Sequence, residues 1–142
     1  MANMEQMIHI VSIENKRGCI VLTHQEVTNT VQKFQRIVLG EVVFDKPFTD
    51  KSILMGTYKN AKKQAEAYET FRKPDGEVVV GNVFFCKENG EFLGSLNEEE
   101  RDKLIFMMSG IYIENNYEWA KNGESQYFYK KTKPLKYGIS SL

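Results

Sequence analysis

The sequence predicts one α+β domain over residues 1–142, with a mainly antiparallel sheet built from hairpins and about three helices packed on one face of it. Three observations lead to this fold class: two apolar segments that double back across turn residues, three segments with helix-forming signals, and a length of 142 residues that suits one domain. Apolar residues make up 42% and charged residues 27%, which is the balance of a folded chain rather than a disordered one.

Two hairpins supply most of the predicted sheet. The first spans residues 7–23, with a turn over residues 14–18 in which Gly18 provides a positive φ. The second spans residues 77–93; its residues 78–86 are apolar on both faces, as in a central strand, and Asn89-Gly90 is a preferred pair for a tight turn. Extended segments are also expected at three further places: residues 41–48, 52–56 and 127–129.

Three helices are predicted from capping residues, propensity and apolar spacing. The first covers residues 23–40, where Thr23 and Glu26 have the spacing of a capping box, although its β-branched residues also suit a strand. The second covers residues 57–73, which are mostly good helix formers, and it ends at the turn sequence of residues 74–76. The third opens at Asn97 and is expected to continue over residues 112–121.

The charge balance and the apolar pattern exclude several classes of protein. The chain has 19 basic and 19 acidic residues, so a dedicated nucleic-acid-binding protein is not expected. No apolar run of about 18 residues is present and the N-terminal residues show no signal-peptide pattern, so we expect a cytoplasmic protein that does not enter a membrane. Cys19 and Cys86 are expected to be buried thiols, with a disulfide or redox pair as the alternative.

Catalytic and metal-binding patterns are not recognisable in this sequence. His9 and His24 lack the spacing of zinc ligands and are interpreted as structural, and neither cysteine carries a nucleophile signature. The sequence has no nucleophile elbow, phosphate-binding loop or dinucleotide fingerprint, so we expect no enzyme activity, metal or cofactor. The acidic residues that cluster are expected on a solvated turn and helix N-terminus: Glu88, Glu91, Glu98, Glu99, Glu100 and Asp102.

The most distinctive stretch is residues 125–138, in which aromatic residues are interspersed with lysines. Aromatic rings stack on bases and lysines neutralise phosphates, so the stretch indicates a surface for an anionic nucleotide. An edge strand with solvated lysines, or a surface for a protein partner, explains the same pattern. The predicted ligand-binding residues are Tyr129, Lys130, Lys131, Lys133 and Tyr137, with Arg72 as an outlying member.

A second basic patch lies on the predicted helix over residues 57–73. It consists of Lys59, Lys62 and Lys63, and Arg72 and Lys73 follow at the end of the segment. The last two are explained without any function, because cations are favoured at the negative end of a helix dipole.

Three classes of function remain open. The favoured class is a non-catalytic binding protein that inhibits a host system by binding a macromolecular component, because compact Lys-, Glu- and Asn-rich domains without motifs are typical of anti-defence accessory proteins of phages and mobile elements. The second is an oligomeric protein that sequesters an anionic signalling or cyclic nucleotide. The third is a small enzyme with no recognisable motif. The expected partners are therefore a host protein or a nucleotide, with a homo-oligomer left open.

Overall fold

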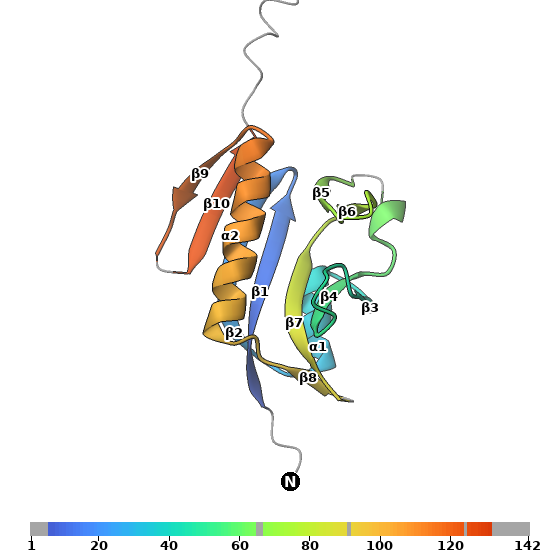
Figure 1. The fold of residues 1–142 in the computed structure, drawn as a ribbon. Coiled ribbons are helices and arrows are strands. Elements are labelled where there is room, and N and C mark those ends of the chain that lie inside the picture. Colours follow the sequence, from blue (N-terminus) through green and yellow to red (C-terminus); the bar gives the residue numbers. More distant parts are fainter. Residues whose placement is uncertain (1–5, 65–66, 91, 124, 132–142) are drawn as a thin grey trace, which may run out of the picture.

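A long antiparallel hairpin of β1 (Met7–Lys16) and β2 (Cys19–Thr28) lies at the centre of the computed structural model, which describes residues 6–64, 67–90, 92–123 and 125–131 (Figure 1). Lys16 pairs with Cys19 across a two-residue turn, in which Arg17 has a φ of 53° and Gly18 a φ of 88°. Two successive residues with positive φ match the right-handed twist of the flanking strands. The predicted hairpin over residues 7–23 is therefore confirmed, and its strands are longer than expected.

The hairpin is the middle of an antiparallel sheet whose strand order is β3-β4-β7-β1-β2-β10-β9, with β8 paired to β7. A separate small sheet pairs β5 with β6. The remaining strands are β3 (Val42–Asp45), β4 (Ile53–Tyr58), β5 (Glu69–Arg72), β6 (Val78–Val80), β7 (Val83–Asn89), β8 (Phe92–Gly94), β9 (Tyr117–Lys121) and β10 (Gln126–Lys131).

Both faces of the large sheet are buried. In β7, Phe84 and Phe85 are consecutive and point to opposite faces, and both are fully buried. Phe85 belongs to the core beneath α2 (Glu98–Glu114), together with Leu104 and Met108 of that helix. Phe84 belongs to the core beneath α1 (Val31–Val38) on the other face, where its ring stacks on Phe34 with centroids 4.8 Å apart.

The predicted arrangement of about three helices on one face is wrong. The described residues contain two α-helices, and they lie on opposite faces of a mainly antiparallel sheet (Figure 1). A third helical element, η1 (Ala61–Lys63), is a single 3₁₀ turn. No helix in this described part of the chain has the length and apolar character needed to cross a membrane.

The first predicted helix begins seven residues later than its capping-box pattern indicated. Strand β2 continues to Thr28, and Val27 is buried opposite Ile8 in the hairpin. The helix then starts after Thr30, whose side-chain Oγ1 accepts a hydrogen bond from the Lys33 amide at 3.2 Å. The β-branched residues before Thr30 form a strand because pairing with β1 buries them, whereas a helix would have left this half of β1 without a partner.

The second predicted helix, residues 57–73, does not form in the described residues. This segment contains the end of β4, then η1, then β5. Strand β5 pairs with β6 and buries Phe71 in the core beneath α2. Helix propensities of ordinary residues differ by less than about 1 kcal/mol per residue. Burial of the Phe71 ring, which contributes about 1.5–3 kcal/mol, and the pairing of β5 with β6 favour the strand instead.

The third helix is confirmed at its start and wrong at its end. Asn97 and Glu100 form a reciprocal capping box, with both hydrogen bonds at 2.8 Å. The helix stops at Glu114, and Asn116 then adopts a positive φ of 67° before β9 begins. Residues 117–121 form a strand because β10 offers them a paired edge.

We predict that Gly56→Ala destabilises the protein by about 1–3 kcal/mol, since an added methyl group would overpack the core. A Cβ atom at Gly56 would collide with the Phe84 ring, which is held between Phe34 and Phe44. The matched control is Gly110→Ala, because a Cβ at Gly110 on α2 meets no atom within 4 Å. Urea unfolding of both variants tests this. Equal stability of Gly56→Ala and the wild-type protein would contradict the packing described here.

Candidate functional site

Tyr129, the first of the predicted ligand-binding residues, lies in the core. Its side chain is 2% exposed on β10, beneath α2. Its hydroxyl donates a hydrogen bond to Ser109 Oγ on that helix, and burial raises the pKa of the phenol. A ligand would have to open the core to reach this ring, so its place in the structure is that of a packing residue.

Lys130 and Lys131 lie next to Tyr129 but face a surface cleft, which we call the basic cleft. It has a volume of about 390 Å³ and lies between the β1–β2 turn, the start of β5 and the β9–β10 pair. Lys131 Nζ is 6.0 Å from the centroid of the Tyr117 ring, within reach of a cation–π contact. The residues that line the basic cleft are Arg17, Gly18, Cys19, Tyr68, Glu69, Tyr117, Lys130 and Lys131.

The remaining predicted residues do not line the basic cleft in the described part of the chain. Arg72 Nη2 lies 3.3 Å from Glu69 Oε1, so it meets the cleft only through this carboxylate. Lys133 and Tyr137 fall outside the described residues. The structure therefore brings together Lys130, Lys131 and, indirectly, Arg72.

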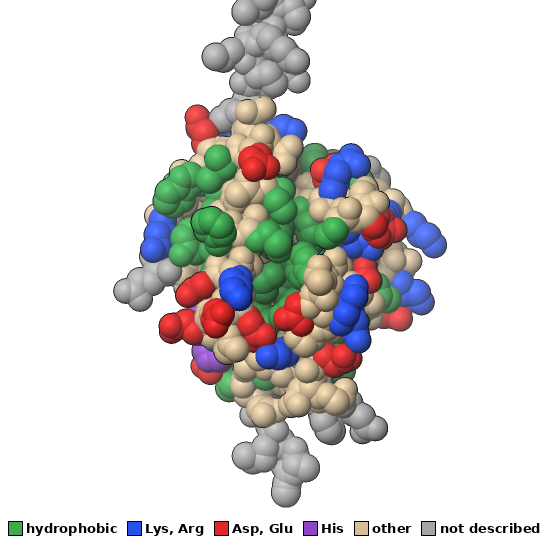
Figure 2. All heavy atoms as spheres, in the orientation of Figure 1, with side chains coloured by type: hydrophobic (Ala, Val, Ile, Leu, Met, Phe, Trp, Pro, Cys, Tyr) green, Lys and Arg blue, Asp and Glu red, His purple; other side chains and the backbone are tan. Residues whose placement is uncertain are grey.

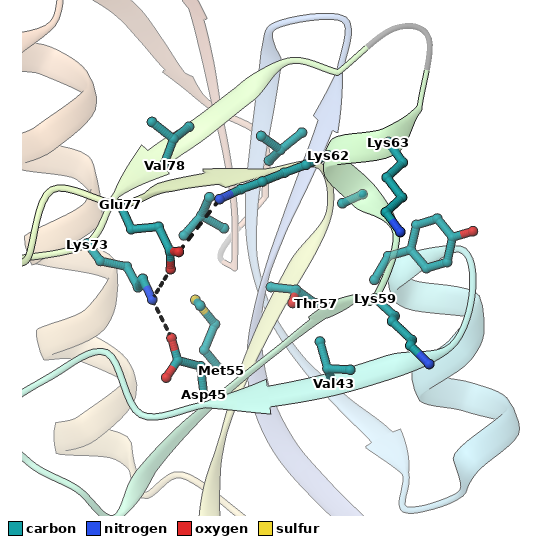
Figure 3. A pocket seen from close by; sticks show the side chains of 14 residues that line it. Val43, Asp45, Met55, Thr57, Lys59, Lys62, Lys63, Lys73, Glu77 and Val78 are labelled. Atoms are coloured by element: carbon teal, nitrogen blue, oxygen red, sulfur yellow. Dashed lines mark hydrogen bonds and ion pairs between the residues drawn. The ribbon is translucent and has the colours of Figure 1, made fainter.

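A second hollow, which we call the lysine pocket, lies between β3, β4, η1 and β6 (Figure 3). Its volume is about 400 Å³, within the range of small-molecule sites. The residues that line the lysine pocket are Val43, Asp45, Met55, Thr57, Tyr58, Lys59, Ala61, Lys62, Lys63, Lys73, Glu77, Val78, Val79 and Val80.

The floor of the lysine pocket is apolar because of the strand register. Val43 pairs with Thr57 and Asp45 with Met55, so these four side chains share one face of the β3–β4 ladder. Strand β6 adds valines across the pocket. The exposed side chains of Lys59, Lys62 and Lys63 line the pocket around this floor.

One end of the lysine pocket is closed by an ion network (Figure 3). Lys73 Nζ lies 2.6 Å from Asp45 Oδ2 and also contacts a carboxylate oxygen of Glu77. These two hydrogen bonds, that to Asp45 first, raise the pKa of Lys73, and the bond from Lys73 is the main cause that lowers the pKa of Asp45. Lys62 Nζ approaches the same Glu77 at 3.8 Å.

The lysine pocket therefore combines a charge network around a largely buried lysine with exposed cations. The Lys73 side chain is only 11% exposed and is held in place, whereas the side chains of Lys59 and Lys62 are 55% and 56% exposed. The lining holds four lysines and two carboxylates, and Lys59 also pairs with Glu41 at 3.6 Å, so a small excess of positive charge remains. Such a surface attracts an anion, and the apolar floor provides contact area for its uncharged part.

The sequence pattern indicated only part of this pocket. The sequence predicts a helix that carries the patch of Lys59, Lys62 and Lys63 and ends at Lys73. In the structure, the turn after β4 and the turn at residues 74–76 bring these four lysines to one pocket. Asp45 and Glu77 were missed. The sequence signal for Asp45 is that every second residue of β3 and of β4 lies on the same face of the sheet. Residue spacing does not show that these two strands pair with each other.

A histidine pair is a further cluster that the sequence did not reveal. His9 Nδ1 lies 3.3 Å from His24 Nε2, because residues on neighbouring strands β1 and β2 share the face that α2 covers. His9 Nε2 is 3.4 Å from Glu26 Oε2. Burial is the main cause that lowers the pKa of His24; the Arg101 and His9 charges lower it further, and Asp102 opposes them.

Several of the acidic residues and both cysteines that the sequence singled out are ion-paired or at least partly buried. Among the acidic residues singled out above, Glu88 pairs with Lys46 at 2.9 Å and Glu100 with Lys87 at 2.7 Å, and Glu91 lies outside the described residues. Cys86 is a free, buried thiol whose pKa is raised by burial to about 12, and Cys19 is a free, partly buried thiol. Within the described ranges, no group of three His, Cys, Asp or Glu residues could hold a metal ion.

Comparison of the chain with protein-family models, with curated proteins and with solved structures finds no match. The lysine pocket and the basic cleft are therefore the features from which a function can be inferred.

We predict that the free energy of unfolding falls as the pH is lowered from about 7 to 5, where histidines take up protons. The folded-state pKa of His24 lies below its ordinary value of 6.5, so the unfolded chain binds the proton first and acidification favours unfolding. His24→Asn should flatten this pH dependence. Urea unfolding of both proteins at a series of pH values measures it, and identical pH profiles would contradict the assignment.

Proposed function

We propose that this protein is a non-catalytic binding protein that holds an anionic small molecule of the nucleoside phosphate class in the lysine pocket. The observation that carries the proposal is the meeting of four lysines, an apolar floor and two fixed carboxylates in one hollow of about 400 Å³. This is the second of the functions expected from the sequence, assigned to a different set of lysines.

The distribution of charge supports a ligand with a phosphate at one end. Lys63 and Lys59 lie near one end of the lysine pocket and the Lys73 network near the other, with Met55 close to that network (Figure 3). Lysine ammonium groups neutralise phosphate as point charges that adapt to its position. A free inorganic anion would leave the apolar floor without a partner, so the ligand also needs an uncharged body.

The apolar and acceptor groups support a nucleoside as that body. Val43, Val78 and Val80 present aliphatic surface, and the Tyr58 ring adds an aromatic face in the same lining. Asp45 and Glu77 keep acceptor lone pairs beyond those used by Lys73, and carboxylates accept hydrogen bonds from ribose hydroxyls or base amino groups. A fatty acid would bring no donors for these acceptors.

A binding role without catalysis is consistent with the chemistry of the lysine pocket. Among the described residues, the cations and carboxylates that meet in this lining pair with one another: Lys73 with Asp45 and Glu77, and Lys62 with Glu77. Lys73, the least exposed cation, has a raised pKa and is thus a stable charge rather than a proton donor or nucleophile. A cytoplasmic location belongs to the proposal, because soluble nucleotides are available there.

A macromolecular target, such as the host component expected from the sequence, is the second candidate function. It is favoured by an apolar groove of about 400 Å³ between α1 and β3, whose lining includes Val31, Phe34, Val42, Phe44 and Leu93. Val31 and Phe44 are 67% and 46% exposed there. Exposed apolar surface of this kind marks protein contacts.

The test is isothermal titration calorimetry with a panel of probes: AMP, cyclic AMP, a cyclic dinucleotide and inorganic phosphate. We predict that at least one nucleotide binds more tightly than phosphate, and that added salt weakens the binding because Lys59 and Lys62 are exposed. The double variant Lys62→Glu/Lys63→Glu should lower the affinity by about tenfold or more, since two attractive charges become repulsive and each exposed charge pair contributes about 0.2–1 kcal/mol.

The matched control is Lys130→Glu/Lys131→Glu, which makes the same change of charge in the basic cleft. Loss of binding in the first double variant, with binding kept in the second, supports the lysine pocket. The reverse result would move the site to the basic cleft, as the sequence pattern first indicated. A panel that binds no better than phosphate would overturn the proposal and leave the macromolecular candidate.

A further inference from the structure

Helix α2 carries an unusual amount of exposed apolar surface along its second half. Phe106 is 83% exposed, Ile113 51% and Met107 37%, while Leu104, Met108 and Tyr112 of the same helix fill the core. Hydrophobic side chains gather over the α2 side of the molecule (Figure 2). The helix is thus apolar on its outer side as well as on its inner side, which is typical of a helix with a partner on both sides.

Trp119 extends this apolar surface onto the neighbouring strand. It pairs in register with Tyr129, and the Tyr129 hydroxyl contacts Ser109 of α2, so both aromatic residues lie on the α2 side of the sheet. Tyr129 is buried, but Trp119 on the outer strand β9 is 54% exposed. Exposed Trp and Phe side chains are the residue types that contribute most to protein interfaces.

The outer line of α2 carries charges of opposite sign at its two ends. Lys103, Met107, Gly110 and Glu114 follow one another at steps of four, three and four residues, which places them on one side of the helix. The order along this line is positive, apolar, small, negative. Such a line is complementary to a second copy of itself only when the two helices run antiparallel.

A second helix at this surface would give Glu114 a charged partner and would fill the space beside Gly110. Glu114 lies in the last turn of α2, at the negative end of the helix dipole, and no basic residue lies in that turn. The structure shows no ion pair of Glu114 with any described residue. At Gly110, a Cβ would meet nothing within 4 Å, so the helix has an open depression there.

We propose that two copies of this chain associate through α2, with the helices antiparallel about a twofold axis. Lys103 pairs with Glu99 of its own helix at 3.1 Å, and in this arrangement it also pairs with Glu114 of the other copy. Met107 of each copy packs over Gly110 of the other. Phe106, Ile113 and Trp119 flank the contact and lose their exposure. Twofold symmetry repeats every contact, so each charge pair occurs twice. The interface does not involve the lysine pocket and stands independently of the proposed ligand.

The test is sedimentation equilibrium of the full chain and of charge-reversed variants. We expect the wild-type protein to dimerise. Lys103→Glu and Glu114→Lys should each raise the dimer dissociation constant by about tenfold or more, because each puts two pairs of like charges in contact. The double variant Lys103→Glu/Glu114→Lys should recover most of the affinity, since it reverses both pairs. Lys33→Glu, on α1 at the opposite face of the sheet, is the charge-matched control.

A second variant separates assembly from folding. Gly110→Gln should keep or raise the thermal stability of the monomer, because glutamine is the better helix former and Gly110 has open space around it. It should weaken the dimer by filling the depression that Met107 occupies. A wild-type protein that stays monomeric at all accessible concentrations would overturn the proposal. So would single charge variants that dimerise as well as the wild-type protein, or a double variant that fails to recover.

Discussion

Burial of the sheet on both faces is the constraint on which the rest of the structure depends. Phe84 and Phe85 are neighbours on β7, point to opposite faces and are both fully buried. One-sided helix packing would leave one of these rings in water at a cost of about 1.5–3 kcal/mol. The chain therefore covers one face with α2 and the other with α1. The residues of β1 divide between the two cores in the same way: Val11 and Ile13 lie in the core beneath α2, and Ile8 and Ile10 lie in the core beneath α1.

The two helices lie over different strands of the sheet, and this difference leaves the candidate site open. Helix α2 contacts β1 and β9, whereas α1 contacts β3, β4 and β7 on the opposite face. The α2 face of β3 and β4 is thus covered mainly by η1 and the small β5–β6 sheet. The lysine pocket is the space that remains there, and its floor includes Met55 and Val79, which are buried members of the core beneath α2. Lys73 closes one end of it because two carboxylates compensate its burial.

The sequence predicted the helices and strands that depend on residues close together in the chain. It mispredicted those that depend on pairing between distant segments. The β1–β2 hairpin, the Asn97 capping box and the strand at residues 127–129 each rest on local signals, and all three are observed. Residues 57–73 have helix-forming side chains, yet the two ends of this segment lie in strands β4 and β5 because β7 and β6 pair with them. The same limit applies to the two hollows. Lys130 and Lys131 line the basic cleft together because they are neighbours in the sequence. Asp45, Lys62 and Lys73 are distant in the sequence and meet in the lysine pocket only through the register of β3 and β4 and the turn before β6.

Amide hydrogen exchange followed by NMR measures whether the sheet is buried on both faces. We expect the slowest amides in β1 and β7, including Val11, Ile13, Phe84 and Phe85, because these strands lie between two cores and open only with the whole fold. The amides of the edge strands β3 and β9 should exchange faster. If β7 exchanged as fast as β9, with protection confined to α2 and its side of the sheet, the second core beneath α1 would not be stable and the account would be contradicted.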